Sequence, residues 1–109
     1  MRTGTLKHRV QLERRQNVQD AAGQQVPTWV PVEEVWADVL FPNGIETMRA
    51  DAPVAIKRAS VRIRYRTDVQ PATWRLVFEG EVFGITAALP DMRRKEHVDL
   101  VAETGQNDG

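Results

Sequence analysis

The segment from Val61 to Arg66 constrains the fold most, because apolar and basic residues alternate along it without interruption. Side chains of a β-strand point to opposite faces in turn, so the alternation predicts a strand with one apolar and one basic face. Val61, Ile63 and Tyr65 would then enter a core. Arg62, Arg64 and Arg66 would stand together outside it and would need an anionic partner or solvent.

Length and composition indicate one small globular domain. The chain has 109 residues, of which 41% are hydrophobic and 28% are charged, as in ordinary folded proteins. It contains 0 cysteines, so no disulfide supports the fold, and the sequence suits a reducing cytoplasm. No apolar run approaches the ~20 residues of a spanning helix, and we expect no membrane contact. The balance of 15 basic and 15 acidic residues argues against a general DNA coat.

The first 41 residues predict a hairpin followed by a further strand. Residues 6–13 alternate like a strand, residues 17–25 resemble a hairpin loop, and residues 35–41 form another strand candidate. Pro27 and Pro31 interrupt residues 26–32. Because each proline lacks a backbone donor, we place this segment at a sheet edge or a bulge. We expect the tryptophans to fill the core or plug a barrel end; these are Trp29, Trp36 and Trp74.

The remaining residues predict one irregular excursion and then more strands. Residues 45–51 favour a short helix that Pro53 limits. Residues 104–109 are expected to form a frayed tail. Further strands are predicted at residues 61–66, 74–78, 81–85 and 96–102. The expected fold is therefore all-β, a small antiparallel β-barrel or sandwich of about six strands with one short helix or extended loop inserted.

No catalytic or metal-binding pattern stands out. Ser60 is the only serine, and no nucleophile elbow surrounds it. His97 and Asp99 would share a strand face, and His8 could lie near them, but their spacing matches no known ligand set. We therefore expect no enzyme activity, no cofactor and no small-molecule substrate, and a small hydrolase or metal enzyme is only a third class of function.

The arginine row has three interpretations. It is a solvated sheet face, a contact with nucleic acid, or a contact with acids of a neighbouring subunit. Tyr65 would face away from the arginines, which disfavours base stacking beside the cations. A secondary basic cluster, Arg93, Arg94 and Lys95, is either a solvated loop or a phosphate contact.

Several short motifs follow one another from Gly4 to about Glu103. They are Gly4-x-Leu6-x-x-Arg9-Val10, Asp20-x-x-Gly23, Trp29, Trp36-Ala37-Asp38-Val39, Gly44-x-Glu46, Arg62-x-Arg64-Tyr65-Arg66 and Gly80-x-x-x-x-Ile85. In order, spacing and total length this set resembles the head–tail joining family of tailed phages, in particular the head-closure or stopper proteins of the connector.

The resemblance implies a single connector-type β-barrel domain over residues 1–109 that forms a ring, joins the DNA-filled head to the tail and helps retain packaged DNA. It implies portal or adaptor proteins, tail-completion proteins and the DNA in the channel as partners. The location would be the head–tail junction of the virion, assembled in the host cytoplasm. The alternative function is a nucleic-acid-binding small β-barrel module.

The resemblance also implies a projecting loop or short helix, which falls here on residues 41–57. The candidate subunit-interface or channel residues are therefore Asn43, Gly44, Glu46 and Arg49 together with Arg62, Arg64 and Arg66.

Overall fold

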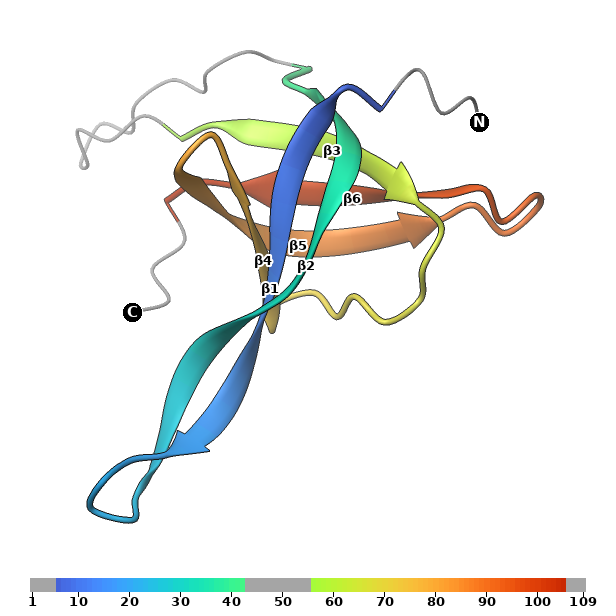
Figure 1. Ribbon diagram of the computed structural model, residues 1–109. Helices are drawn as coiled ribbons and strands as arrows, with labels where there is room; N and C mark the ends of the chain where they lie inside the picture. The colour runs from blue at the N-terminus through green and yellow to red at the C-terminus, as the bar shows by residue number, and fades with distance from the viewer. Residues whose placement is uncertain (1–5, 43–55, 106–109) are drawn as a thin grey trace.

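The chain forms a closed barrel of antiparallel strands in a computed structural model that describes residues 6–42 and 56–105 (Figure 1). The order around the barrel is β1-β2-β3-β6-β5-β4, and β4 pairs with β1 to close it. The predicted six-stranded all-β barrel is confirmed, and closure distinguishes it from a sandwich. The strands are β1 (His8–Gln19), β2 (Gln25–Leu40), β3 (Arg58–Arg64), β4 (Trp74–Phe78), β5 (Glu81–Pro90) and β6 (His97–Glu103).

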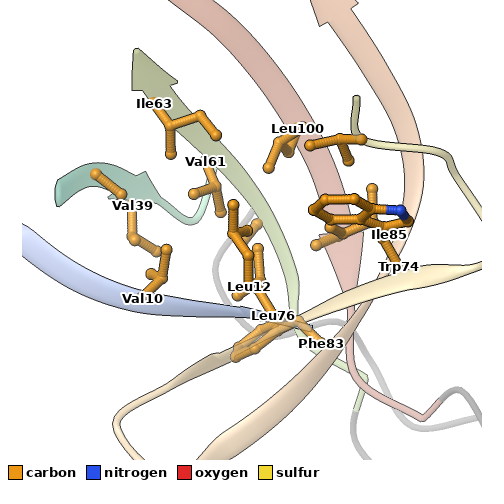
Figure 2. Close-up of a cluster of buried hydrophobic side chains, with 14 of the residues drawn as sticks. Val10, Leu12, Val39, Val61, Ile63, Trp74, Leu76, Phe83, Ile85 and Leu100 are labelled. Carbon is orange, nitrogen blue, oxygen red and sulfur yellow. The ribbon is translucent and has the colours of Figure 1, made fainter. Parts of the chain in front are cut away.

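The barrel interior is filled by aliphatic side chains and a few large aromatic ones (Figure 2). Every strand contributes alternate residues to it, as the period of a strand requires. Phe83 and Trp74 are the largest of these side chains, and they are 1% and 5% exposed. The smaller fully buried side chains are Val10, Leu12, Val61, Ile63, Leu76, Ile85, Val98 and Leu100.

Strand β3 has the two faces that its sequence predicts. Val61 and Ile63 are buried, whereas Arg62 is half-buried and Arg64 is exposed on the outer face. The strand ends at Arg64, so Tyr65 is only half-buried and Arg66 belongs to the segment that follows the strand.

Strands β1 and β2 are longer than the barrel. They pair with each other from His8↔Ala37 to Gln19↔Gln25, whereas β4 pairs with β1 only at residues 11–14. The remainder projects from the barrel as a two-stranded ribbon (Figure 1). We call residues 16–28 of this ribbon the arm. The sequence prediction of a loop at residues 17–25 was wrong on this point, because the arm has solvent on both faces and therefore lacks the apolar alternation that marks the barrel strands.

The prolines of β2 lie where prediction placed them, at an edge and a bulge. Pro27 pairs with Asn17 in the arm, where β2 has only β1 beside it among the described strands. Pro31 pairs with Glu13, next to the register shift between Leu12 and Glu13. At both positions β2 pairs only with β1, so the missing backbone N–H of proline breaks no hydrogen bond to a strand on the other side.

Trp74 occupies the core as predicted, but the prediction that Trp36 is buried was wrong. Ala37 and Val39 point inward, so Trp36 shares the outer face of β2 and is 50% exposed. The guanidinium of Arg9, its neighbour on β1, lies 4.6 Å from the centre of its ring. Trp29 is half-buried in the ribbon.

Some expectations fall at or beyond the ends of the described segments. The predicted helix at residues 45–51 and the candidate residues Asn43, Gly44, Glu46 and Arg49 lie outside the described residues. Thr104 is 8% exposed, its Oγ1 accepts from the Lys57 amide at 2.9 Å, and its amide donates to the Lys57 carbonyl at 2.9 Å. The folded barrel therefore includes Thr104, which the sequence assigned to the frayed tail.

Replacing each of two tryptophans by alanine tests the assignment of the strand faces. Trp74→Ala should lower the free energy of unfolding by about 3–5 kcal/mol, because it removes a buried ring and leaves a cavity. Trp36→Ala should lower it by about 1 kcal/mol or less, because that ring is half exposed and stacks on a solvated arginine. Urea denaturation of both variants measures the difference, and equal losses would contradict the assignment.

Candidate assembly surfaces on the barrel

Arg62 is neutralised within its own chain. It lies directly opposite Asp99 on β6, and its Nε and Nη2 donate to the two carboxylate oxygens at 2.7 and 3.0 Å. The hydrogen bonds from Arg62 lower the pKa of Asp99, and the same bonds raise the pKa of Arg62. This fork geometry favours both charged forms, so Arg62 presents a fixed ion pair on the outer face of the barrel.

Arg66 is also engaged within the chain. Its Nε and Nη2 donate to Asp68 at 2.7 and 2.8 Å, and its Nη1 donates to Glu33 of β2 at 2.9 Å. The pKa of Arg66 is raised, first by its hydrogen bond to Asp68. Its guanidinium also lies 5.9 Å from the ring centre of Trp74. Arg66 therefore ties the segment after β3 to the outside of β2.

Arg64 lies between these two pairs and is exposed on the outer face of β3. It is in register with His97 of β6, whose Nδ1 is 3.8 Å from Asp91 Oδ2. Arg62 and Arg64 therefore share the outer face of β3, whereas Arg66 lies in the segment that follows the strand and is bonded to Asp68 and Glu33.

A groove opens beside Arg64, where β2 and β3 separate. β2 pairs with β3 only at residues 37–40, so no described strand lies on that side of residues 33–36. The groove has a volume of about 280 Å³. Its carboxylates are paired, Glu33 with Arg66 and Glu34 with Arg9. It is lined by Glu33, Glu34, Val35, Trp36, Ile63, Arg64, Tyr65 and Arg66.

Cation–ring contacts and an ion pair surround the base of the arm. Trp29 lies near two guanidiniums, with the centre of its ring 4.5 Å from Arg75 and 5.9 Å from Arg15. Arg75 also donates to Glu13 at 2.7 Å, and both side chains of this pair are largely buried. These contacts pack the base of the ribbon against β4, which carries Arg75.

The secondary basic cluster forms the loop between β5 and β6. The side chain of Asp91 accepts from the amides of Arg93 and Arg94 at 3.1 and 3.3 Å, and its carbonyl accepts from the Lys95 amide at 3.0 Å. The side chains of Arg93, Arg94 and Lys95 are exposed. These bonds give the loop a defined shape, and its cations point into solvent.

Other ion pairs cross between neighbouring strands. Sequence reasoning missed them, because residues that face each other across a sheet are far apart in the chain and pair only once the register is known. One example is Arg58 of β3 with Glu103 of β6, at 3.0 Å. Lys57, which precedes β3, also pairs with Glu81 of β5, a strand that is not next to β3, at 2.8 Å.

His8, one of the candidate metal ligands, is used within the fold. His8 Nδ1 accepts from the Val39 amide at 3.1 Å, and its ring packs edge-on against Phe78. Within residues 6–42 and 56–105, no three His, Cys, Asp or Glu side chains gather as a metal site would require. The same residues include no helix with the length and apolar character needed to cross a membrane.

Comparison with known proteins identifies the family. The family model described as phage head completion protein matches residues 1–105. The chain therefore belongs to the phage head completion proteins and is a structural protein of the phage head, as the ordered motifs indicated. No curated protein matches the sequence.

Solved structures share the fold. The solution structure of protein SF1141 from Shigella flexneri 2a has a TM-score of 0.68 and 23% identity, covering 98% of this chain and 99% of that one. A chain in the virion of the native gene transfer agent particle has a TM-score of 0.70 and 22% identity, covering 90% of this chain and 93% of that one. At these identities the likeness establishes the barrel fold.

The pair of Arg62 and Asp99 should stabilise the barrel in a pH-dependent way. Because the pKa of Asp99 is lowered in the folded protein, its contribution is complete above the unfolded value of about 3.9 and is lost as the pH falls through the folded value. Asp99→Asn should therefore cost about 1 kcal/mol at pH 7, since the pair is partly exposed, and the difference from the natural protein should shrink below about pH 4.

Unfolding by urea at several pH values measures this difference. Glu79→Gln, a change of an exposed carboxylate in the turn between β4 and β5, is the control and should cost little at any pH. A cost of Asp99→Asn that stays constant down to about pH 2 would contradict the assignment.

Proposed function

We propose that this head completion protein forms a ring at the head–tail junction, joins the filled head to the tail and helps retain packaged DNA. The observation that carries the proposal is the match of the phage head completion family over residues 1–105. Portal or adaptor proteins and tail-completion proteins are the expected partners, and packaged DNA is expected to pass through the ring.

The distribution of charge on the barrel supports assembly with other proteins. The chain carries no net charge, and its outer arginines Arg62 and Arg66 pair with acids of the same chain. A surface of this kind presents fixed, neutral ion pairs, which give orientation across a contact without general attraction to polyanions. A ring built from one kind of subunit needs two different patches on each subunit. The projecting arm and the groove are two such patches.

The direct test is association with the connector. Purified protein is mixed with assembled portal and examined by sedimentation velocity and negative-stain microscopy. We expect a ring-shaped layer on the portal, even if the isolated chain stays monomeric, because the portal raises the local concentration of subunits. Failure to associate with itself or with any connector component would refute the proposal.

The alternative function, a nucleic-acid-binding module, has one supporting feature, the exposed loop with Arg93, Arg94 and Lys95. DNA binding through several phosphate contacts should weaken steeply as salt rises. A ring that only surrounds DNA should bind free duplex poorly. A titration of a short duplex at rising salt concentrations separates the two functions.

Arg64 tests the role of the arginine row in assembly. Arg64→Glu should leave the melting temperature of the monomer nearly unchanged, because this side chain is exposed on the outer face of β3. It should weaken association with the portal at least tenfold, because it reverses a charge at the edge of the groove. Lys7→Glu, a charge reversal at another exposed position, is the matched control. Gross unfolding of Arg64→Glu, or full association, would contradict this role.

A further inference from the structure

We propose that the arm of one subunit, residues 16–28, docks into the groove of the next subunit of the ring. The inference rests on the proposed ring and specifies the contact that builds it. Three features support it: the arm carries little charge, it projects away from its own barrel, and the carboxylates of the groove are already paired within their chain.

The arm has the composition of a protein–protein interface. Asp20 is its only charged residue, although 28% of the whole chain is charged. The Asp20 carboxylate is used inside the turn, where it accepts from the amides of Ala22 and Gln24 at 2.9 and 2.8 Å. Depletion of charge is characteristic of the centre of a protein interface, whereas a solvated hairpin is normally rich in charge.

One face of the arm carries a pair of exposed valines, on the same side of β1 as the residues that line the barrel interior. Val10, Leu12 and Val18 lie an even number of residues apart on β1, so they share a face. Val18 pairs with Val26, and these side chains are 41% and 39% exposed. A two-stranded ribbon is only marginally stable in water by itself. Covering this valine pair would therefore stabilise the arm.

The arm is held away from its own groove. Its base is fixed by Arg15 and Arg75 near Trp29 and by Arg75 bonded to Glu13. From Arg15 to the turn it reaches roughly 20 Å beyond the barrel, at about 3.3 Å per residue, and Figure 1 shows it pointing outward. The groove lies at the base of the ribbon, on residues 33–36 and 63–66. The tip of the arm can therefore fill the groove of another copy, but not that of its own chain.

The groove suits an uncharged occupant. Glu33 is paired with Arg66 and Glu34 with Arg9 of the same chain, so these carboxylates require no cation from a partner. Its apolar wall includes Val35, Trp36 and Tyr65. A ribbon with two exposed valines, whose one carboxylate is used inside its own turn, matches this surface better than a highly charged peptide or a phosphate would. Because the arm and the groove differ, the contact runs from head to tail, which is the arrangement that closes into a ring.

Disulfide trapping tests the contact in assembled particles. The chain has 0 cysteines, so only introduced thiols can react. A variant carrying both Val18→Cys and Trp36→Cys, produced in cells that assemble the particle, should give a ladder of multiples of the 12.4 kDa chain on non-reducing gels. Val82→Cys combined with Trp36→Cys is the control, because Val82 is 39% exposed, as Val18 is at 41%, but lies on β5. Equal ladders for the two variants, or no ladder for the first, would overturn the proposal.

A second variant separates the arm contact from ring formation itself. Val18→Asp with Val26→Asp should leave the melting temperature nearly unchanged and reduce association with the portal at least tenfold, whereas Val82→Asp should not reduce it. If the natural protein forms a ring and the arm variant does so equally well, the arm contact is refuted and the ring stands. If the natural protein forms no ring with any connector component, both proposals fail.

Discussion

Closure of the barrel by β4 against β1 is the constraint on which the rest of the structure depends. Closure pairs every described strand with two neighbours, and it fixes which alternate side chain of each strand faces inward. Val61 and Ile63 must then point inside, and the arginines between and after them must lie on the outer surface. Beyond the barrel, the ends of β1 and β2 pair only with each other and form the arm.

Ion pairs between neighbouring strands lie on the outer surface of the barrel, and in each pair the two charges cancel. The ion pair of Arg62 with Asp99 joins β3 to β6, and the pair of Glu13 with Arg75 joins β1 to β4 at the closing seam. Partly exposed pairs add modest stability, but they specify the register of neighbouring strands. They also pair two of the outer-face cations, Arg62 and Arg75, with acids of the same chain.

The sequence predicted the barrel because the period of two is clear wherever one strand face is buried. Prediction from the sequence failed where neither face of a strand is buried. Residues 17–25 lack apolar alternation, which predicts a loop, because both faces of the arm are exposed to solvent. The apolar alternation around Trp36 predicts a core or barrel-end position, but Glu34 and Asp38 share its face and the inward-facing Ala37 and Val39 occupy the other. The groove and the pairing of Arg66 with Glu33 depend on where β2 and β3 separate, and no local pattern encodes that point.

Hydrogen exchange, measured on the isolated protein and on the assembled particle, tests the account most directly. In the isolated protein the amides of β3 and β6 should exchange slowly, and those of the arm should exchange fast, because a lone ribbon opens readily. Assembly should slow exchange at residues 16–28 and 33–36 together and leave the barrel unchanged. Arm amides that exchange as fast in the particle as in the isolated chain would contradict the account.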